Sequence, residues 1–397
     1  MIYLIDKINT TYEKKEISDI QVAQNLRVAE YLREFWEANQ WHPNADIDFY
    51  LNIMNSRKEK AKSFILSLGS NGQPETVWIG RIEEKEVPIK LAYHTITKPR
   101  LNVLTFIYGG FLGCQSRHNI EKILNALKHL LKSKSIDVIV FQHILKDSLL
   151  FEILHSHRPI LLRDFFPETF MHWKMTIPSG MEAIYNKLPA KRRQEIRRQT
   201  RKLYKDFNDK IRIECYAKSR EIDRLMIEVE EIASKSYQRG IGVGFQNDAE
   251  TRNRLLFLAE KGWLRAFVLY VKDEPCAFNV GTVYHQQFIG NFASFDRDFD
   301  KYTPGTILLL HVIELLIKEN VQSLDFGFGD AFYKSRFGDD SWEESVVYFF
   351  SPTFKGMILS ILRNSTIILS RLMIKVLGNF AYKIKKYWRK KLIPGTS

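Results

Sequence analysis

The chain has 397 residues, of which 45% are hydrophobic and 13% aromatic, and a formal net charge of +13. This length exceeds one ordinary core and this composition excludes a disordered chain, so we expect two folded domains. Three scattered cysteines without a Cys-x-x-Cys pair argue against a disulfide framework or a cysteine zinc site and favour a reducing compartment. No apolar run has the length of a membrane span, and the opening residues show no signal-peptide pattern. We therefore expect a cytoplasmic protein.

The positive charge is concentrated in two segments. Residues 187–205 hold nine Lys or Arg and one acid, a net of +8, and residues 352–397 hold ten Lys or Arg and no acid, a net of +10. Subtracting both from +13 leaves −5 for the remainder of the chain. The protein is thus near-neutral apart from two basic segments, each of which needs its own explanation.

The first half begins with an amphipathic helical pattern up to about residue 60 and then changes to strand patterns. The apolar spacing that follows predicts a strand at 101–108, a helix at 118–132, a strand at 137–142 and a further helix from 147. A strand–helix–strand order implies a mixed or parallel sheet that is covered by helices.

The second half follows a similar order. We predict helices at 187–207, 220–237 and 249–261, strands at 264–271, 275–284 and 286–294, a helix from 304, and a strand at 323–326 that ends in the Gly-rich corner 327–330. Both halves thus pass from helices through three strands to a helix and another strand, which suggests two copies of one α/β fold. We place an N-terminal domain at 1–175, a C-terminal domain at 176–350 and a helical extension at 351–397.

The turn before the helix at 304 is the main candidate for a ligand site. Proline is tolerated at a helix start, and the free N–H groups there favour an anion. The carboxylates of Asp325 and Asp330 follow on the next strand and corner, so the sequence suggests a phosphate-bearing ligand held beside an acid. The alternative is an ordinary proline-initiated helix.

Three stretches resemble the GNAT acyltransferase superfamily, in particular its CelD-like, BioF-associated branch, which is related to the Fem aminoacyltransferases. They read LPAKRRQEIRRQTRKLYK (188–205), FDRDFDKYTPGT (295–306) and LDFGFGDAFYKSRFGD (324–339). The resemblance covers about residues 175–345. It implies an α/β fold of two tandem GNAT-like domains, with a degenerate N-terminal copy and a catalytic C-terminal one.

The resemblance also implies an acyl-CoA co-substrate, most simply acetyl-CoA. Its pyrophosphate would lie at the helix start, which assigns cofactor binding to Tyr302, Pro304, Gly305 and Thr306. This loop departs from the commoner Arg/Gln-x-x-Gly-x-Gly/Ala form, which leaves room for aminoacyl-tRNA as the donor.

Acyl transfer needs a base for the nucleophile and a proton donor for the departing thiolate. Asp325 or Asp330 is the expected base, Tyr333 can protonate the thiolate, and Lys334 can pair with the carboxylates or hold an anion. Alternatively, the aspartates cap turns and Lys334 is their ion-pair partner.

Substrate binding is expected on three further features. Arg193, Arg197 and Arg201 share one face of the basic helix by their four-residue spacing, a pattern that suits a phosphate, a nucleotide-sugar or tRNA. Tyr237 and Gln238 stand before a Gly-rich turn, and Phe295 and Asp296 open the loop before the helix. A solvated helix and a plain loop are the alternatives.

The extension is the second basic segment. Over 357–391 one broad helical face is apolar, with Arg363, Arg371, Lys375 and Lys383 towards the other side, followed by aromatics among cations. Such a helix can lie on an anionic membrane surface, here the inner face of the membrane. Packing onto the protein or pairing with a second chain are the alternatives.

The ten histidines show no metal-ligand spacing, so no metal is expected. The sequence favours an acyl-CoA-dependent N- or O-acyltransferase that acts on a sugar, an amino-sugar or a lipid-linked glycan in envelope or exopolysaccharide synthesis. The first alternative is a Fem-like transferase that uses aminoacyl-tRNA, with nucleic acid as a partner. The second is a non-catalytic module that binds a membrane or nucleic acid.

Overall fold

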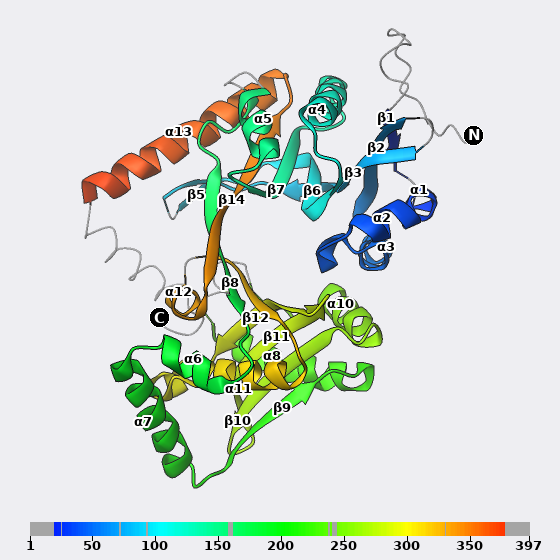
Figure 1. Cartoon of the computed structure of the whole chain (residues 1–397). Coiled ribbons are helices and arrows are strands. Elements are labelled where there is room, and N and C mark those ends of the chain that lie inside the picture. The colour runs from blue at the N-terminus through cyan, green and yellow to red at the C-terminus, as the bar shows by residue number, and fades with distance from the viewer. Residues whose placement is uncertain are drawn as a thin grey trace. The chain divides into compact units, whose positions relative to one another are not determined.

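The computed structural model describes residues 20–377, except 25, 71, 72, 93, 158–161, 237, 238, 240–243 and 330. The chain forms two compact units, and over the described residues the first comprises residues up to Phe170 together with those from Glu343 onwards, while the second comprises Met171–Trp342. Each unit is described by itself below (Figure 1).

The first unit contains a mixed sheet in the order β1-β2-β3-β6-β7-β14, with a two-stranded ribbon, β4-β5. Its elements are β1 (Ile20–Ala23), α1 (Arg27–Tyr31), α2 (Arg33–Asn39), η1 (Pro43–Ala45), α3 (Ile47–Ser56), β2 (Ala61–Ser70), β3 (Gln73–Glu86), β4 (Ile89–Leu91), β5 (His94–Thr97), β6 (Arg100–Gly113), α4 (Arg117–Lys132), β7 (Val138–Leu145), α5 (Leu149–His157), β14 (Asp340–Phe350) and α13 (Phe354–Leu377).

Helices cover both faces of this sheet. Ile123 and Leu127 of α4 and Leu154 of α5 pack in one core cluster with Trp78 and Phe106 of the sheet. On the other face, side chains of α2 and α3 form a second cluster with alternate residues of β2 and β3. The helical pattern expected up to residue 60 is wrong at its described start, because residues 20–23 form β1, which pairs antiparallel with β2.

The second unit contains a sheet in the order β8-β13-β12-β11-β10-β9. Its elements are β8 (Glu168–Thr176, whose first three residues belong to the first unit), α6 (Met181–Lys187), α7 (Ala190–Asp206), β9 (Ile211–Tyr216), η3 (Ser219–Glu221), α8 (Ile222–Ser234), α10 (Ala249–Glu260), β10 (Leu264–Val271), β11 (Glu274–Tyr284), β12 (Gln287–Phe295), η4 (Arg297–Tyr302), α11 (Pro304–Lys318), β13 (Ser323–Phe328) and α12 (Phe332–Phe337).

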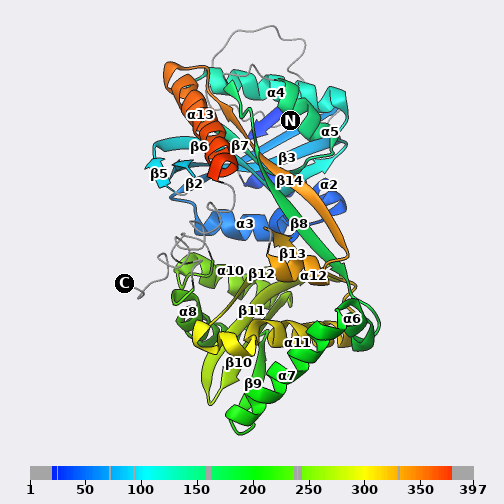
Figure 2. The same ribbon diagram turned by 90° about the vertical axis from the view of Figure 1, so that its left-hand side faces the viewer.

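The alternation of side chains along β10 divides the helices between the two faces of this sheet. Phe267 and Leu269 lie in the cluster that includes Leu308 of α11 and residues of α6 and α7. Tyr270 points the other way and bonds to Glu228 of α8. Figure 2 shows α11, α6 and α7 alongside this sheet in a second view.

Both halves of the sequence repeat one order: a three-stranded antiparallel meander, a helix, a parallel strand, a short helix and a last strand. The last strand, however, pairs in the other half's unit. β8 follows α5 in the chain but pairs with β13, and β14 follows α12 but pairs with β7. The compact units therefore draw strands from both halves of the sequence. The limits predicted at 175 and 350 stay predictions about domains.

Candidate active site

The parallel strands β12 and β13 separate in the middle of the second sheet. Their pairing runs from Gln287↔Ser323 to Ile289↔Asp325, while β12 itself continues to Phe295. Within the described part of the chain, no strand pairs with that edge of β12 beyond Ile289. Separated parallel strands leave backbone N–H and C=O groups without strand partners, so this opening can receive an extended ligand through backbone hydrogen bonds.

A bulge and two glycines shape the opening. Asn291 is the extra residue of β12 between Gly290 and Phe292, and its Oδ1 accepts a 2.8 Å bond from Thr282. An added Cβ at Gly290 would lie 3.4 Å from the carbonyl oxygen of Asp325. Gly327 has a φ of +67°, a left-handed conformation that favours glycine. The bulge at Asn291 and the two glycines therefore set the course of the backbone where β12 and β13 separate.

Helix α11 follows β12 in the chain, after the short helix η4. Thr303 is left-handed, with φ 52° and ψ 51°, and Pro304 is the first helical residue. No side chain caps this N-terminus. The N–H groups of Thr306 and Ile307 donate to the Thr303 carbonyl, at 3.0 and 3.2 Å, whereas the Gly305 N–H precedes this first bonded turn. The helix start is therefore suited to an anion.

Gly305 lies against the aromatic ring that ends β12. A Cβ at this position would lie 3.3 Å from Cδ1 of Phe295. Two residues that the sequence assigned to different roles, Gly305 to the cofactor and Phe295 to the substrate, are thus neighbours.

The corresponding helix of the first unit, α4, has a different N-terminus. Ser116 is its N-cap, and the Ser116 side chain accepts a bond from the Asn119 N–H at 3.2 Å. Asn119 in turn donates to Thr76 and to the Cys114 carbonyl. Because protein groups occupy the α4 N-terminus, the two helices are not equivalent as anion sites.

Asp325 is buried at the separation point and is held by several donors. His172 Nε2 lies 2.6 Å from Asp325 Oδ1, and the Gly327 N–H donates to the same oxygen at 2.7 Å. Oδ2 has a longer contact, 3.4 Å, from Nε2 of Gln287. The ring of His172 stacks on Trp342 with centroids 4.4 Å apart. Oδ1 therefore has two short polar contacts, whereas Oδ2 has a longer one and is the oxygen more open to a further hydrogen bond.

Lys334 binds backbone carbonyl groups at the end of β13. Its Nζ donates to the carbonyls of Gly327 and Phe328, at 3.1 and 2.6 Å, and the side chain is buried. Burial lowers the pKa of Lys334 to about 8, although the nearby Asp325 opposes this shift. Tyr333, the next residue back along α12, is 40% exposed, and its ring lies edge-on to Phe326.

Tyr302, a residue of the predicted site, and its neighbour Thr303 connect the start of α11 to the basic helix α7. Tyr302 is buried, and its hydroxyl donates to Asp206 at 2.8 Å. Thr303 Oγ1 donates to Gln199 at 2.8 Å. Helix α7 therefore fixes the loop that precedes Pro304.

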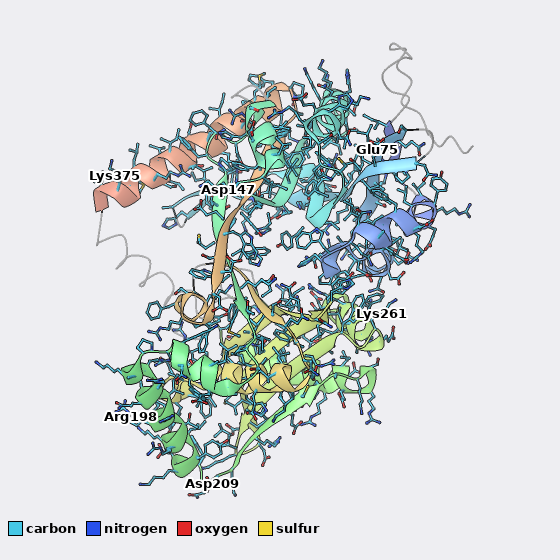
Figure 3. All side chains as sticks on the ribbon, viewed as in Figure 1. Glu75, Asp147, Arg198, Asp209, Lys261 and Lys375 are labelled. Atoms are coloured by element: carbon cyan, nitrogen blue, oxygen red, sulfur yellow. The ribbon has the colours of Figure 1, made fainter. Side chains whose placement is uncertain are left out.

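The cations of α7 point mainly to solvent. Arg197 and Arg201 are exposed, and Arg193 is half-buried and donates to Asn186 at 3.1 Å. Ile196 and Leu203 form the opposite, buried side. Figure 3 labels Arg198, which extends outwards from this helix. The structure thus presents a row of exposed cations, as the helical spacing predicts.

Of the remaining predicted site residues, the structure describes Asp296 but not Asp330, Tyr237 or Gln238. Asp296 is buried, accepts a 2.6 Å ion pair from Lys235, and caps η4 through the Asp298 N–H. Asp330, Tyr237 and Gln238 lie outside the described residues. Among the described residues, no group of three or more His, Cys, Asp or Glu side chains could hold a metal ion.

The sequence analysis missed His172 and Gln287. His172 lies between the helix predicted from 147 and the one predicted at 187, where no strand was predicted, although the run from Phe170 to Thr176 is typical of a strand. Gln287 carries no local signal for a site, because its place depends on how two distant strands pair.

Known proteins resemble both the sequence and the fold. Residues 190–335 match the family model of the acetyltransferase (GNAT) domain. This stretch of the chain is therefore similar to a GNAT domain, and it lies within the residues 175–345 that the sequence resemblance covers. None of the curated proteins matches the sequence.

Two solved structures extend the likeness to most of the chain. FemX is 10% identical, with a TM-score of 0.53 over 83% of this chain and 97% of FemX. A tandem GNAT protein from the clavulanic acid biosynthesis pathway is 9% identical, with a TM-score of 0.50 over 83% of this chain and 98% of that protein. These likenesses concern the fold alone, and they confirm a mixed α/β architecture of two tandem GNAT-like domains.

Proposed function

We propose that the second unit transfers an acyl group, in the first instance acetyl, from a coenzyme A thioester to an amine or hydroxyl group. The acceptor class we propose is a sugar, an amino-sugar or a lipid-linked glycan precursor of the envelope or of exopolysaccharide. The observation that carries the proposal is the uncapped N-terminus of α11, which follows in the chain the strand that separates from β13.

The arrangement fits a coenzyme in two ways. A pyrophosphate at Pro304, Gly305 and Thr306 would accept a bond from the Gly305 N–H and would face the positive end of the helix dipole, because Pro304 has no N–H and that of Thr306 donates to Thr303. The amide groups of a pantetheine arm could then pair with the open edge of β12. The thioester would lie towards the bulge at Asn291, close to Asp325 on β13.

The chemistry requires one proton acceptor and one proton donor. The acceptor's nitrogen or oxygen attacks the thioester carbonyl, Asp325 Oδ2 takes its proton directly or through a water molecule, and the C–S bond then breaks. The partly exposed hydroxyl of Tyr333 is the proposed proton donor to the leaving thiolate. Lys334, with its lowered pKa, stabilises the strand end that carries Asp325.

Titration with acetyl-CoA by calorimetry tests the proposal. Wild type should bind with micromolar affinity, and Gly305→Glu should lose binding because the new carboxylate occupies and repels the phosphate position. Gly180→Glu is the matched control, since an added Cβ at Gly180 meets nothing within 4 Å. Absence of binding to the wild type, or full binding by Gly305→Glu, would contradict a coenzyme site at α11.

The second candidate is transfer from aminoacyl-tRNA, and the exposed cations of α7 favour it. Here tRNA binding should weaken steeply with salt, and Arg197→Glu together with Arg201→Glu should lower both the affinity and the salt slope. A non-catalytic module is the third candidate. It is supported if neither thioester nor charged tRNA is turned over while anions still bind.

The membrane partner expected from 357–391 is independent of this site, because it concerns α13 and the residues that follow it. Among the helices of the described residues, none has the length and hydropathy needed to cross a bilayer.

A further inference from the structure

Helix α13 packs on the first unit with polar side chains and with Leu359, which is buried in an apolar cluster that includes Val87 and Ile89. Arg363 donates to Asp164 at 2.8 Å and lies over the ring of Tyr348. Asn364 donates to the Arg163 carbonyl at 3.1 Å and accepts from the Phe165 N–H at 2.7 Å. The inward face of this helix is thus attached mainly by hydrogen bonds and one buried ion pair.

Further contacts hold both ends of α13 in the same orientation. Near its start, Lys355 makes an ion pair with Asp137 at 3.1 Å, and near its end the Ser370 hydroxyl accepts a bond from the Ala92 N–H at 2.7 Å. Gly356 faces inward so closely that an added Cβ would lie 2.1 Å from the Ser351 carbonyl oxygen. The rotation of the helix about its axis is therefore fixed.

Eight large apolar side chains of α13, in contrast, face solvent. At 100° per residue they lie along one stripe of the helix, and they are between 40% and 84% exposed: Phe354, Ile358, Ile361, Ile368, Leu369, Leu372, Met373 and Val376. From its first to its last residue the stripe spans about 33 Å at 1.5 Å per residue. A contiguous exposed apolar surface of this kind marks a contact site rather than chance exposure.

Charge decides which partner suits the stripe. Lys355 flanks it on one side and Arg371 and Lys375 on the other, and residues 352–397 contain no acid at all. Two copies of this chain that paired along the stripe would bring the cations of both helices together, and the helix itself has no carboxylate to compensate them. An anionic lipid surface instead supplies both an apolar layer and negative headgroups.

We propose that the outward stripe of α13 lies in the interface of an anionic membrane leaflet, with its flanking cations at the headgroups. The helix would lie parallel to the membrane plane, held there by its inward polar contacts with the first unit (Figure 1). This inference does not depend on which acyl donor the second unit uses.

Sedimentation of the full chain with vesicles tests the inference. Binding should occur to phosphatidylcholine vesicles that contain about 30% phosphatidylglycerol, be weak on phosphatidylcholine alone, and fall in 0.5 M salt. Ile361→Glu combined with Leu372→Glu should lower the partition coefficient about 100-fold or more, because each side chain loses its burial in lipid. Lys375→Glu should lower it about tenfold.

The control is Ile227→Glu, which places the same charge on an isoleucine that is 65% exposed in the second unit. It should bind vesicles like the wild type, and all variants should keep the wild-type melting temperature since the changed side chains are exposed. The inference is overturned if the wild type ignores anionic vesicles or if the stripe variant binds them equally well. It is also overturned if the wild type is a dimer that the stripe variant converts to a monomer, because a second copy would then cover the stripe.

Discussion

His172 and Asp325, which are 153 positions apart in the sequence, meet with 2.6 Å between Nε2 and Oδ1. Strand β8 brings the histidine beside β13, and Asp325 is the last residue of β13 that pairs with β12. The imidazole and the Gly327 N–H both engage Oδ1, so the orientation of the carboxylate is fixed. The pair therefore bears on both the stability of the sheet and the proposed chemistry, and each of these two effects can be tested.

Removing the imidazole should destabilise the protein. His172→Phe keeps a ring to stack on Trp342 but removes the imidazole partner of the buried carboxylate, which then keeps the Gly327 N–H on the same oxygen. We expect the free energy of unfolding to fall by about 2–3 kcal/mol, as for a buried bond to a charged group. Denaturant unfolding of this variant measures the loss. The exposed His129→Phe should leave the stability unchanged, and an equal loss in both would contradict the role of the pair.

The amide variant of the proposed base should separate binding from catalysis. Asp325→Asn retains the shape and most hydrogen-bonding capacity but cannot take the proton from the nucleophile. We expect kcat to fall about 10²–10⁴-fold while the affinity for acetyl-CoA changes little. Steady-state kinetics measures kcat, and calorimetry measures the affinity for acetyl-CoA. A kcat close to that of the wild type would move the base to Asp330 or to another group.

Lys334 should titrate near pH 8 rather than near its ordinary value of about 10.4. Since the folded-state pKa is lowered, the stability contribution of this group is present above the unfolded pKa and is lost as pH falls through about 8. The free energy of unfolding should therefore rise between about pH 8 and 10.5, by up to about 3 kcal/mol. NMR titration of the lysine Nζ groups locates the midpoint. The rise should be missing from Lys334→Met, and the prediction fails if both proteins follow the same pH profile.

The link between α7 and the start of α11 should affect coenzyme binding. Gln199→Leu removes the acceptor of the Thr303 hydroxyl and loosens the left-handed residue that precedes Pro304. We expect a loss of about 1 kcal/mol of stability and an acetyl-CoA affinity a few-fold weaker. Gln194→Leu, at an exposed position of the same helix, is the control for calorimetry. Equal affinities in the two variants would show that the link does not position the site.

Local signals in the sequence predicted much of the second unit. The proline at the start of α11 and the alternation in β10–β12 depend on neighbouring residues, and the predicted bounds lie close to those observed. The pairing of β8 with β13 was not predictable in this way. His172 reaches Asp325 only after two segments from different halves of the sequence have paired, and no local pattern specifies that pairing.

The orientation of helix α13 was likewise not predictable from its own residues. Its amphipathic character could be read from the spacing of its apolar residues, but the direction of each face could not. Arg363 was expected on the side away from the apolar face, which is correct, yet that side turns inward because Asp164 and Tyr348 offer it a buried partner and an aromatic ring. Burial of a cation was decided by the partner and not by the helix itself.

The return of β14 to the first sheet has a consequence for synthesis on the ribosome. Lys146, just after β7, makes an ion pair with Glu343, and 197 residues separate the two. At about 5–20 residues per second, β7 emerges about 10–40 s before the strand that will cover its edge. During that interval β7, which is rich in Val, Ile and Phe and pairs with β6 on one side, has its other edge uncovered. A chaperone that shields such edges should therefore raise the yield of correctly folded chain.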